Sequence, residues 1–189
     1  MITTLISAVN NKIFYGYDIS HKQWKIKEED PSARRKVNTV LIEVSDGESM
    51  CIKLDSKKLG KPCKYLNLKS RGYTSGCDAV ILHRIADDLF VSYIELKSDK
   101  YKNIDIENKF KASRAFMRYL FAIAKEFFEM DIKPKAEYYI LFSSREMKVA
   151  MTNPRKQPYI DLTSEIRVKK FGAMKYPNKT MKNISKFYT

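Results

Sequence analysis

The stretch from Cys77 to Lys97 most constrains what this 189-residue chain can fold into. It holds two runs rich in β-branched and aromatic residues, separated by a short polar break around Asp87. This pattern is typical of a β-hairpin, because such side chains favour strands and polar breaks favour turns. Folding the stretch about Asp87 places Asp78 opposite the segment Glu95–Lys97. We therefore expect one end of the hairpin to gather an Asp, a Glu and a Lys.

These three charged residues suit one kind of chemistry. Alternate residues of a strand share a face, so Glu95 and Lys97 should point the same way. Two carboxylates a few ångströms apart repel each other and favour a cation between them, and oxygen ligands suit Mg²⁺ or Mn²⁺. Such a metal activates water and neutralises charge on a phosphate, and a nearby lysine stabilises the transition state. The arrangement predicts metal-assisted hydrolysis of a phosphodiester. The competing interpretation is a solvent-facing ion pair at a strand edge.

The motif formed by Asp78, a spacer and Glu95-Leu96-Lys97 at the end of an apolar strand resembles that of the PD-(D/E)XK nuclease superfamily. By position, the resemblance implies that Asp78 and Glu95 are metal ligands, that the Leu96 backbone carbonyl is a further ligand and that Lys97 is the catalytic lysine. It implies Mg²⁺ or Mn²⁺ as the cofactor. Cys77 stands where the superfamily often has a proline before the first acid.

The resemblance also implies a fold, an α/β (mixed α+β) restriction-endonuclease-like core whose central mixed β-sheet is flanked by helices. The expected order of elements agrees with it. A strand at Lys64–Lys69 precedes the hairpin, a long helix covers Ile106–Met130, and an apolar strand follows at Ala136–Phe142. This βββαβ order covers about residues 63–143. Superfamily members often add an acid from an early element, for which Glu43 is the candidate, followed by Glu29 and Glu48.

The predicted helix carries one apolar stripe with spacings of three and four, formed by Ala112, Phe116, Leu120, Ile123 and Phe127. Lys111, Arg114, Arg118 and Lys125 fall on the opposite face at 100° per residue, as expected for a solvated face. Lys109 and Ser113 lie on or beside the apolar side, near the helix start. A lysine there either extends its charge to solvent or points into a polar cleft. The helix has no Gln, which the recombination-type branch of the superfamily carries there.

The charge of the chain is concentrated in two segments. The formal net charge is +14, of which Lys53–Arg71 contributes +6 and Asn153–Thr189 contributes +7. Such clustering favours a nucleic-acid partner over mere solubility, with DNA preferred to RNA. The candidate backbone contacts are Lys69, Arg71, Lys109, Arg114 and Arg118. The basic, aromatic tail from Tyr176 either packs on the core or binds nucleic acid.

Length and composition predict a single domain over residues 1–189. No run of 18 apolar residues occurs, so no transmembrane helix and no membrane partner are expected. The beginning of the chain lacks the pattern of a secretory signal. Three widely spaced cysteines indicate reduced thiols in a cytoplasm, without a disulfide frame or a zinc site.

The sequence thus predicts a metal-dependent endonuclease, in phage defence, restriction or mobile-element processing. Two alternatives remain at this stage. One is a catalytically inactive nucleic-acid-binding module on the same fold. The other is an interaction subunit of a larger complex, whose basic surface meets an acidic partner protein. A homodimer is expected only by resemblance, because superfamily members that cut duplexes commonly dimerise. The substrate strand, its sequence and the cleavage polarity are left open.

Overall fold

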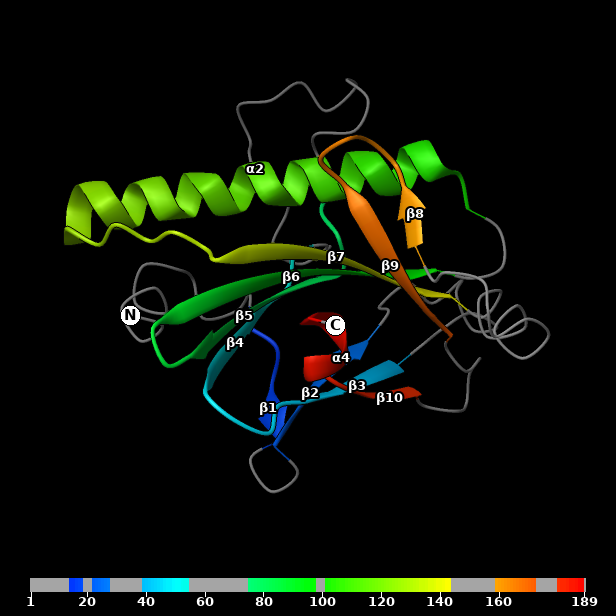
Figure 1. Ribbon diagram of the computed structural model, residues 1–189, viewed down its shortest axis with the longest axis horizontal. Helices are drawn as coiled ribbons and strands as arrows, with labels where there is room; N and C mark the ends of the chain where they lie inside the picture. Colours follow the sequence, from blue (N-terminus) through cyan, green and yellow to red (C-terminus); the bar gives the residue numbers. More distant parts are fainter. Residues whose placement is uncertain are drawn as a thin grey trace.

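Three layers stack in the computed structural model: helix α2 (Asn103–Phe128), a six-stranded sheet and a four-stranded sheet (Figure 1). The structure describes residues 14–18, 22–27, 39–54, 75–97, 101–143, 159–172 and 180–188. The six-stranded sheet is covered on both faces, which explains why its central strands are almost wholly apolar. The fold is therefore of the mixed α and β class that the sequence predicts.

The six-stranded sheet has the order β4-β5-β6-β7-β9-β8. Its strands are β4 (Glu48–Ile52), β5 (Ala79–Ile85), β6 (Asp88–Lys97), β7 (Ala136–Ser143), β9 (Arg167–Gly172) and β8 (Tyr159–Asp161). Strands β4, β5 and β6 are antiparallel, whereas β7 and β9 continue parallel to β6. The parallel step from β6 to β7 needs a crossover, and α2 provides it. The order β4-β5-β6-α2-β7 agrees with the predicted βββαβ order.

The predicted hairpin is confirmed as β5 and β6. Its register pairs Ala79 with Ile94 and Ile85 with Asp88, around a turn in which Ala86 has φ of 51°. Continuing this register by one residue places Asp78 opposite Glu95, as the sequence predicts. The residues of the motif therefore lie at the end of the hairpin farthest from its turn.

The prediction of which strand lies beside the hairpin was wrong. Strand β4 pairs with β5, and β7 pairs with the other side of β6, so both sides of the hairpin are filled. The segment Lys64–Lys69 lies outside the described residues. Strand β4 is at the edge of this sheet, yet both of its faces are covered: Met50 and Ile52 are buried on the helix side and Cys51 is buried on the side of the smaller sheet. The sheet also extends beyond residues 63–143 at both ends.

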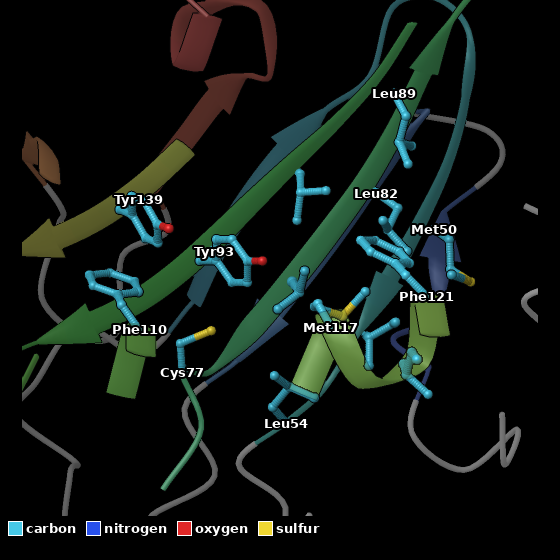
Figure 2. Packing of buried hydrophobic residues seen from close by; sticks show 14 of the residues in the cluster. Met50, Leu54, Cys77, Leu82, Leu89, Tyr93, Phe110, Met117, Phe121 and Tyr139 are labelled. Atoms are coloured by element: carbon cyan, nitrogen blue, oxygen red, sulfur yellow. The ribbon is translucent and has the colours of Figure 1, made fainter. Parts of the chain in front are cut away.

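Helix α2 packs on one face of the six-stranded sheet (Figure 2). Its buried residues are Ile106, Phe110, Ser113, Met117, Leu120, Phe121 and Ala124. The predicted stripe is wrong in phase, since it shares only Leu120 with this set, and Phe127 is 74% exposed. The buried positions 113, 117, 121 and 124 each follow a predicted position by one residue, so the packed face is rotated by about 100° from the predicted stripe and includes Ser113, which was expected on or beside the apolar side.

The four-stranded sheet covers the opposite face. It has the order β1-β2-β3-β10, with β1 (Tyr17–Asp18), β2 (Gln23–Lys27), β3 (Thr39–Glu43) and β10 (Thr180–Asn183). Helix α4 (Ser185–Tyr188) follows β10 and lies between the two sheets (Figure 1). Ile184 and Phe187 are buried there with Phe142 of β7. The end of the chain thus packs on the core, which was one of its two predicted roles.

His83 joins the two layers at the turn end of the hairpin. Its Nε2–H donates to the Asp46 carbonyl at 2.7 Å, and its Nδ1 is hydrogen-bonded to the Tyr188 hydroxyl at 2.8 Å. Both ring nitrogens therefore have hydrogen-bond partners, so this buried histidine has a structural role. Among the described residues, no helix combines the length and apolar character that crossing a membrane requires.

Candidate active site

The acidic and basic residues of the motif face helix α2. Along β6, Tyr93 belongs to the core beneath the helix, while Ile94 and Leu96 belong to the core beneath the smaller sheet. Because side chains alternate along a strand, Glu95 and Lys97 point toward the helix. The same alternation along β5, where Val80 faces the helix, places Asp78 on this side too.

Asp78 is fixed against the peptide that follows Glu95. Its Oδ2 accepts the backbone N–H of Leu96 at 2.5 Å, and the side chain is nearly buried. The N–H and C=O of one strand residue point to the same side, so the Leu96 carbonyl also lies toward Asp78. Strand β5 begins only at Ala79, which leaves this side of β6 to Asp78 rather than to a strand partner. The position fits the carbonyl ligand that the resemblance implies.

Glu95 is the electrostatic centre of the site. Its carboxylate is fully buried, and its Oε1 lies 2.6 Å from Nζ of Lys97 and 2.9 Å from Nζ of Lys109. Among the described residues, neither oxygen accepts a well-directed hydrogen bond, so the two short contacts hold Oε1 by charge, and Oε2 has no hydrogen-bond donor. A buried charge is costly unless it is paired, and the two lysines supply the opposite charge.

Lys109 is held in place by a chain of hydrogen bonds. Its carbonyl accepts a hydrogen bond from the Ser113 hydroxyl at 2.8 Å, one helical turn further on. The same Ser113 oxygen accepts the backbone N–H of Cys77 at 2.8 Å. Cys77 directly precedes Asp78, so these bonds tie the first turns of α2 to the segment that carries the first acid. The two predicted possibilities for Lys109 were extension to solvent or entry into a polar cleft. The structure places its ammonium in a polar cluster with Glu95, and Ser113 lies beside it.

Cys77 lies beside both carboxylates, but its thiol is unreactive. Burial, together with the negative charges of Glu95 and Asp78, raises the pKa of its thiol to about 12. The thiol is therefore protonated at neutral pH and donates to the Ala79 carbonyl at 3.1 Å. A protonated, buried thiol is neither a nucleophile nor a metal ligand. Cys77 therefore adds no reactive group beside the two carboxylates.

The residues present fit a divalent cation with oxygen ligands. The donors are two carboxylates and a backbone carbonyl, which suit Mg²⁺ or Mn²⁺ rather than a soft metal. Within the described part of the chain, the buried Oε2 of Glu95 accepts no hydrogen bond. In the described part of the chain, no group of three or more His, Cys, Asp or Glu side chains gathers to hold a metal. Magnesium usually keeps several waters, so two acids are a sufficient set.

Three residues near the site were not identified from the sequence. The Tyr15 hydroxyl donates to the Asp78 carbonyl at 3.2 Å, and the Lys53 ammonium lies 5.5 Å from the Tyr15 ring centroid. Ser143 ends β7 opposite Lys97 in the parallel register and is fully buried. Only Ser143 had a usable signal, because the carboxyl ends of neighbouring parallel strands meet at one sheet edge. Tyr15 comes from a distant segment with no motif.

Glu43 is not brought to this site. It ends β3 in the smaller sheet, opposite Gln23 and Asn183. From there the chain runs directly through Asp46, which contacts His83, into β4 at the turn end of the hairpin. Glu48 lies at that end as well, opposite Arg84, and Glu29 lies outside the described residues. The site residues lie at the other end of β5 and β6, so no early acid joins them within the described chain.

The predicted backbone contacts are divided. Lys69 and Arg71 lie outside the described residues, and Lys109 contacts Glu95. Arg114 forms an ion pair with Glu165 at 2.8 Å, with its side chain only 14% exposed, which indicates a structural role. Arg118 is exposed on the helix surface. Of the three candidates that the structure describes, Lys109 alone lies at the acids.

Several basic residues of the C-terminal segment also have structural partners. The Lys169 ammonium donates to the Lys186 carbonyl at 2.8 Å. Lys169 and Lys182 both lie within 6 Å of the Phe171 ring centroid, at 5.7 and 5.6 Å. Lys170 pairs with Leu141 in the register and so faces the helix side of the sheet, toward the acids. Fewer basic residues of this segment therefore border the site than its net charge suggests.

Comparisons with known proteins give no relative. No protein-family model, no curated protein and no solved structure matches the chain. The functional argument therefore depends on the geometry of the site.

Proposed function

We propose that this protein is a metal-dependent nuclease with a restriction-endonuclease-like core. The observation that carries the proposal is the fully buried Glu95 carboxylate, placed beside Asp78 and facing the lysine two residues further along the same strand. The order β4-β5-β6-α2-β7 supports the same conclusion. Burying a charged cluster at the end of a sheet costs stability, so a functional role explains it better than a structural one.

Each residue then has a role that follows from its position. Asp78, Glu95 and the Leu96 carbonyl would hold Mg²⁺ or Mn²⁺, which when bound would supply Lewis-acid stabilisation of the phosphate and an activated water. The Lys97 side chain lies beside these proposed ligands and is 26% exposed, so its ammonium can contact a bound phosphodiester. Its positive charge would stabilise the negative charge that develops on the phosphate oxygens. Lys170 on β9 extends the positive charge on the same face of the sheet.

The direct test is cleavage of plasmid DNA, single-stranded DNA and RNA by the purified protein in Mg²⁺ or Mn²⁺. We expect cleavage of at least one substrate, preferably DNA, and complete inhibition by excess EDTA. The Glu95→Gln protein, which keeps the size of the side chain and removes its charge, is the matched control for contaminating nucleases. Equal activity in wild type and Glu95→Gln would show that the activity is not that of this site.

Nucleic-acid binding should depend strongly on salt and should persist without catalysis. Each phosphate neutralised on duplex DNA changes the slope of log affinity against log salt by about 0.9. We expect a steep slope for wild type that is retained by Glu95→Gln, because the basic residues around the site remain. Fluorescence anisotropy with a labelled duplex between low and moderate salt measures it. A flat salt response would indicate that the basic segments serve solubility alone.

A second candidate is a nucleic-acid-binding module on the same fold that has no catalytic activity. The pairing of Glu95 with two lysines favours it, because such a carboxylate is charge-compensated without a cation. The two candidates differ in metal binding: the nuclease binds Mn²⁺ through Asp78 and Glu95, and the silent module does not. Salt-dependent binding to DNA with neither Mn²⁺ binding nor cleavage would favour the module.

A further inference from the structure

Glu95 faces two ammonium groups, and only one of them belongs to the motif. Lys97 follows it on β6, whereas Lys109 comes from α2 and its Nζ lies 2.9 Å from the same oxygen. The Lys109 side chain is 16% exposed, so its charge is more enclosed than that of Lys97. With both lysines and both acids ionised, the cluster is electrically neutral. A second enclosed positive charge at the carboxylate therefore needs an explanation of its own.

We propose that Lys109 is a positioning residue that couples the loading of a divalent cation to the binding of the nucleic-acid backbone. The inference rests on the nuclease function proposed above. A cation held by Glu95 must share this carboxylate with the ammonium of Lys109, and like charges within about 4–6 Å repel. A phosphodiester offers that ammonium another anionic partner. Lys109 thus opposes the cation in the free protein and stops opposing it once the backbone is bound.

The geometry assigns this role to Lys109 rather than to Lys97. The Lys109 backbone is tied through Ser113 to Cys77, the residue before Asp78, so its Cα is fixed relative to the acids. Its ammonium, at the end of a flexible four-carbon stem, can turn from the carboxylate to a phosphate without any movement of the helix. The Cα of Lys97 is instead fixed relative to Glu95 within one strand, and its side chain is more exposed than that of Lys109.

The coupling must be reciprocal. If bound nucleic acid raises the affinity for the cation by some factor, the cation raises the affinity for nucleic acid by the same factor. Removing the charge of Lys109 should remove the opposition, so metal binding to the free protein becomes tighter. A purely structural role predicts the opposite sign, because a disturbed site binds metal more weakly. The sign of the change therefore separates the two roles without any measurement of cleavage.

The test is calorimetric titration with Mn²⁺, with and without a phosphorothioate-substituted DNA duplex that resists cleavage. For wild type we expect the duplex to tighten Mn²⁺ binding about tenfold or more, within the range of roughly 5- to 150-fold typical of coupled sites. Lys109→Met and Lys109→Gln should bind Mn²⁺ about tenfold more tightly without the duplex, and the duplex should add little. Lys109→Arg keeps the charge and should keep the coupling. The matched control is Lys111→Met, since Lys111 is exposed on the same helix and pairs with Glu107.

The outcomes separate this inference from the function on which it rests. Circular dichroism melts show which variants fold, and two neutral substitutions guard against the loss of one. If wild type binds Mn²⁺ but neither neutral variant binds it more tightly, the coupling role is overturned and the nuclease proposal stands. If wild type binds no Mn²⁺ with or without the duplex, the proposed metal site itself fails.

Discussion

Glu95→Ala will abolish both Mn²⁺ binding and cleavage, whereas Lys97→Ala will abolish cleavage and spare metal binding. Glu95 supplies a charged ligand, and Asp78 without it should hold the cation poorly, because magnesium gives up its waters reluctantly. Lys97 adds positive charge beside the cation, so it cannot help the cation to bind. Its contribution must come in the transition state, where removing one stabilising group costs about a hundredfold or more in rate. Calorimetric Mn²⁺ titration and a plasmid cleavage assay measure the two effects.

The environment of Glu95 determines the controls for this experiment. Removing its carboxylate leaves the ammonium groups of Lys97 and Lys109 facing each other, so Glu95→Ala should also lose stability. Each variant is therefore assayed below its unfolding temperature, with Lys111→Ala as the control for loss of a helix-surface lysine. If Lys97→Ala cleaves as fast as wild type while Glu95→Ala still binds metal, the motif is a coincidental ion pair and the binding module replaces the enzyme.

The hairpin and its three charged residues could be predicted because every step depends on local periodicity. Strand propensity, a polar break and alternation of side chains are enough to place Asp78 opposite Glu95 and to orient Lys97. The buried face of α2 was harder to predict. The predicted stripe included Phe127, which is exposed, whereas Ser113, expected on or beside the apolar side, is buried in the packed face. A serine satisfied by hydrogen bonds to Cys77 and Lys109 is stable in a core, but those partners are known only after folding.

Long-range pairing was the other limit. Lys64–Lys69 was predicted to be the strand beside the hairpin because it is close to the hairpin in sequence. Strand β4, which is farther away in sequence, pairs with the hairpin instead. Tyr15 reaches Asp78 across 63 positions, and no local pattern signals such a contact. The assignment of Glu43 as an extra acid depended on resemblance alone, without any geometric constraint. Beyond the hairpin, helical periodicity indicated Lys109 and Ser113, whereas no local pattern indicated Tyr15.

Of the substitutions considered, truncation of Phe187 near the end of the chain should lower the stability most. Phe187 is 1% exposed, and its ring lies 5.6 Å from that of Phe171 and 6.3 Å from that of Phe142, centroid to centroid. Replacing a buried phenylalanine by alanine removes its burial and leaves a cavity, at a cost of about 3–5 kcal/mol. For a chain of this length, we expect the melting temperature of Phe187→Ala to fall by roughly 10 °C.

This experiment also separates the two predicted roles of the basic, aromatic tail. Lys186 is its neighbour on α4 and is exposed, so Lys186→Ala should change stability by less than about 0.5 kcal/mol. If the tail is structural, as its packing indicates, Phe187→Ala binds DNA like wild type below its melting temperature. Differential scanning calorimetry and fluorescence anisotropy at 10 °C test both statements. A Phe187→Ala protein with unchanged melting but weakened DNA binding would place the tail on the nucleic acid instead of on the core.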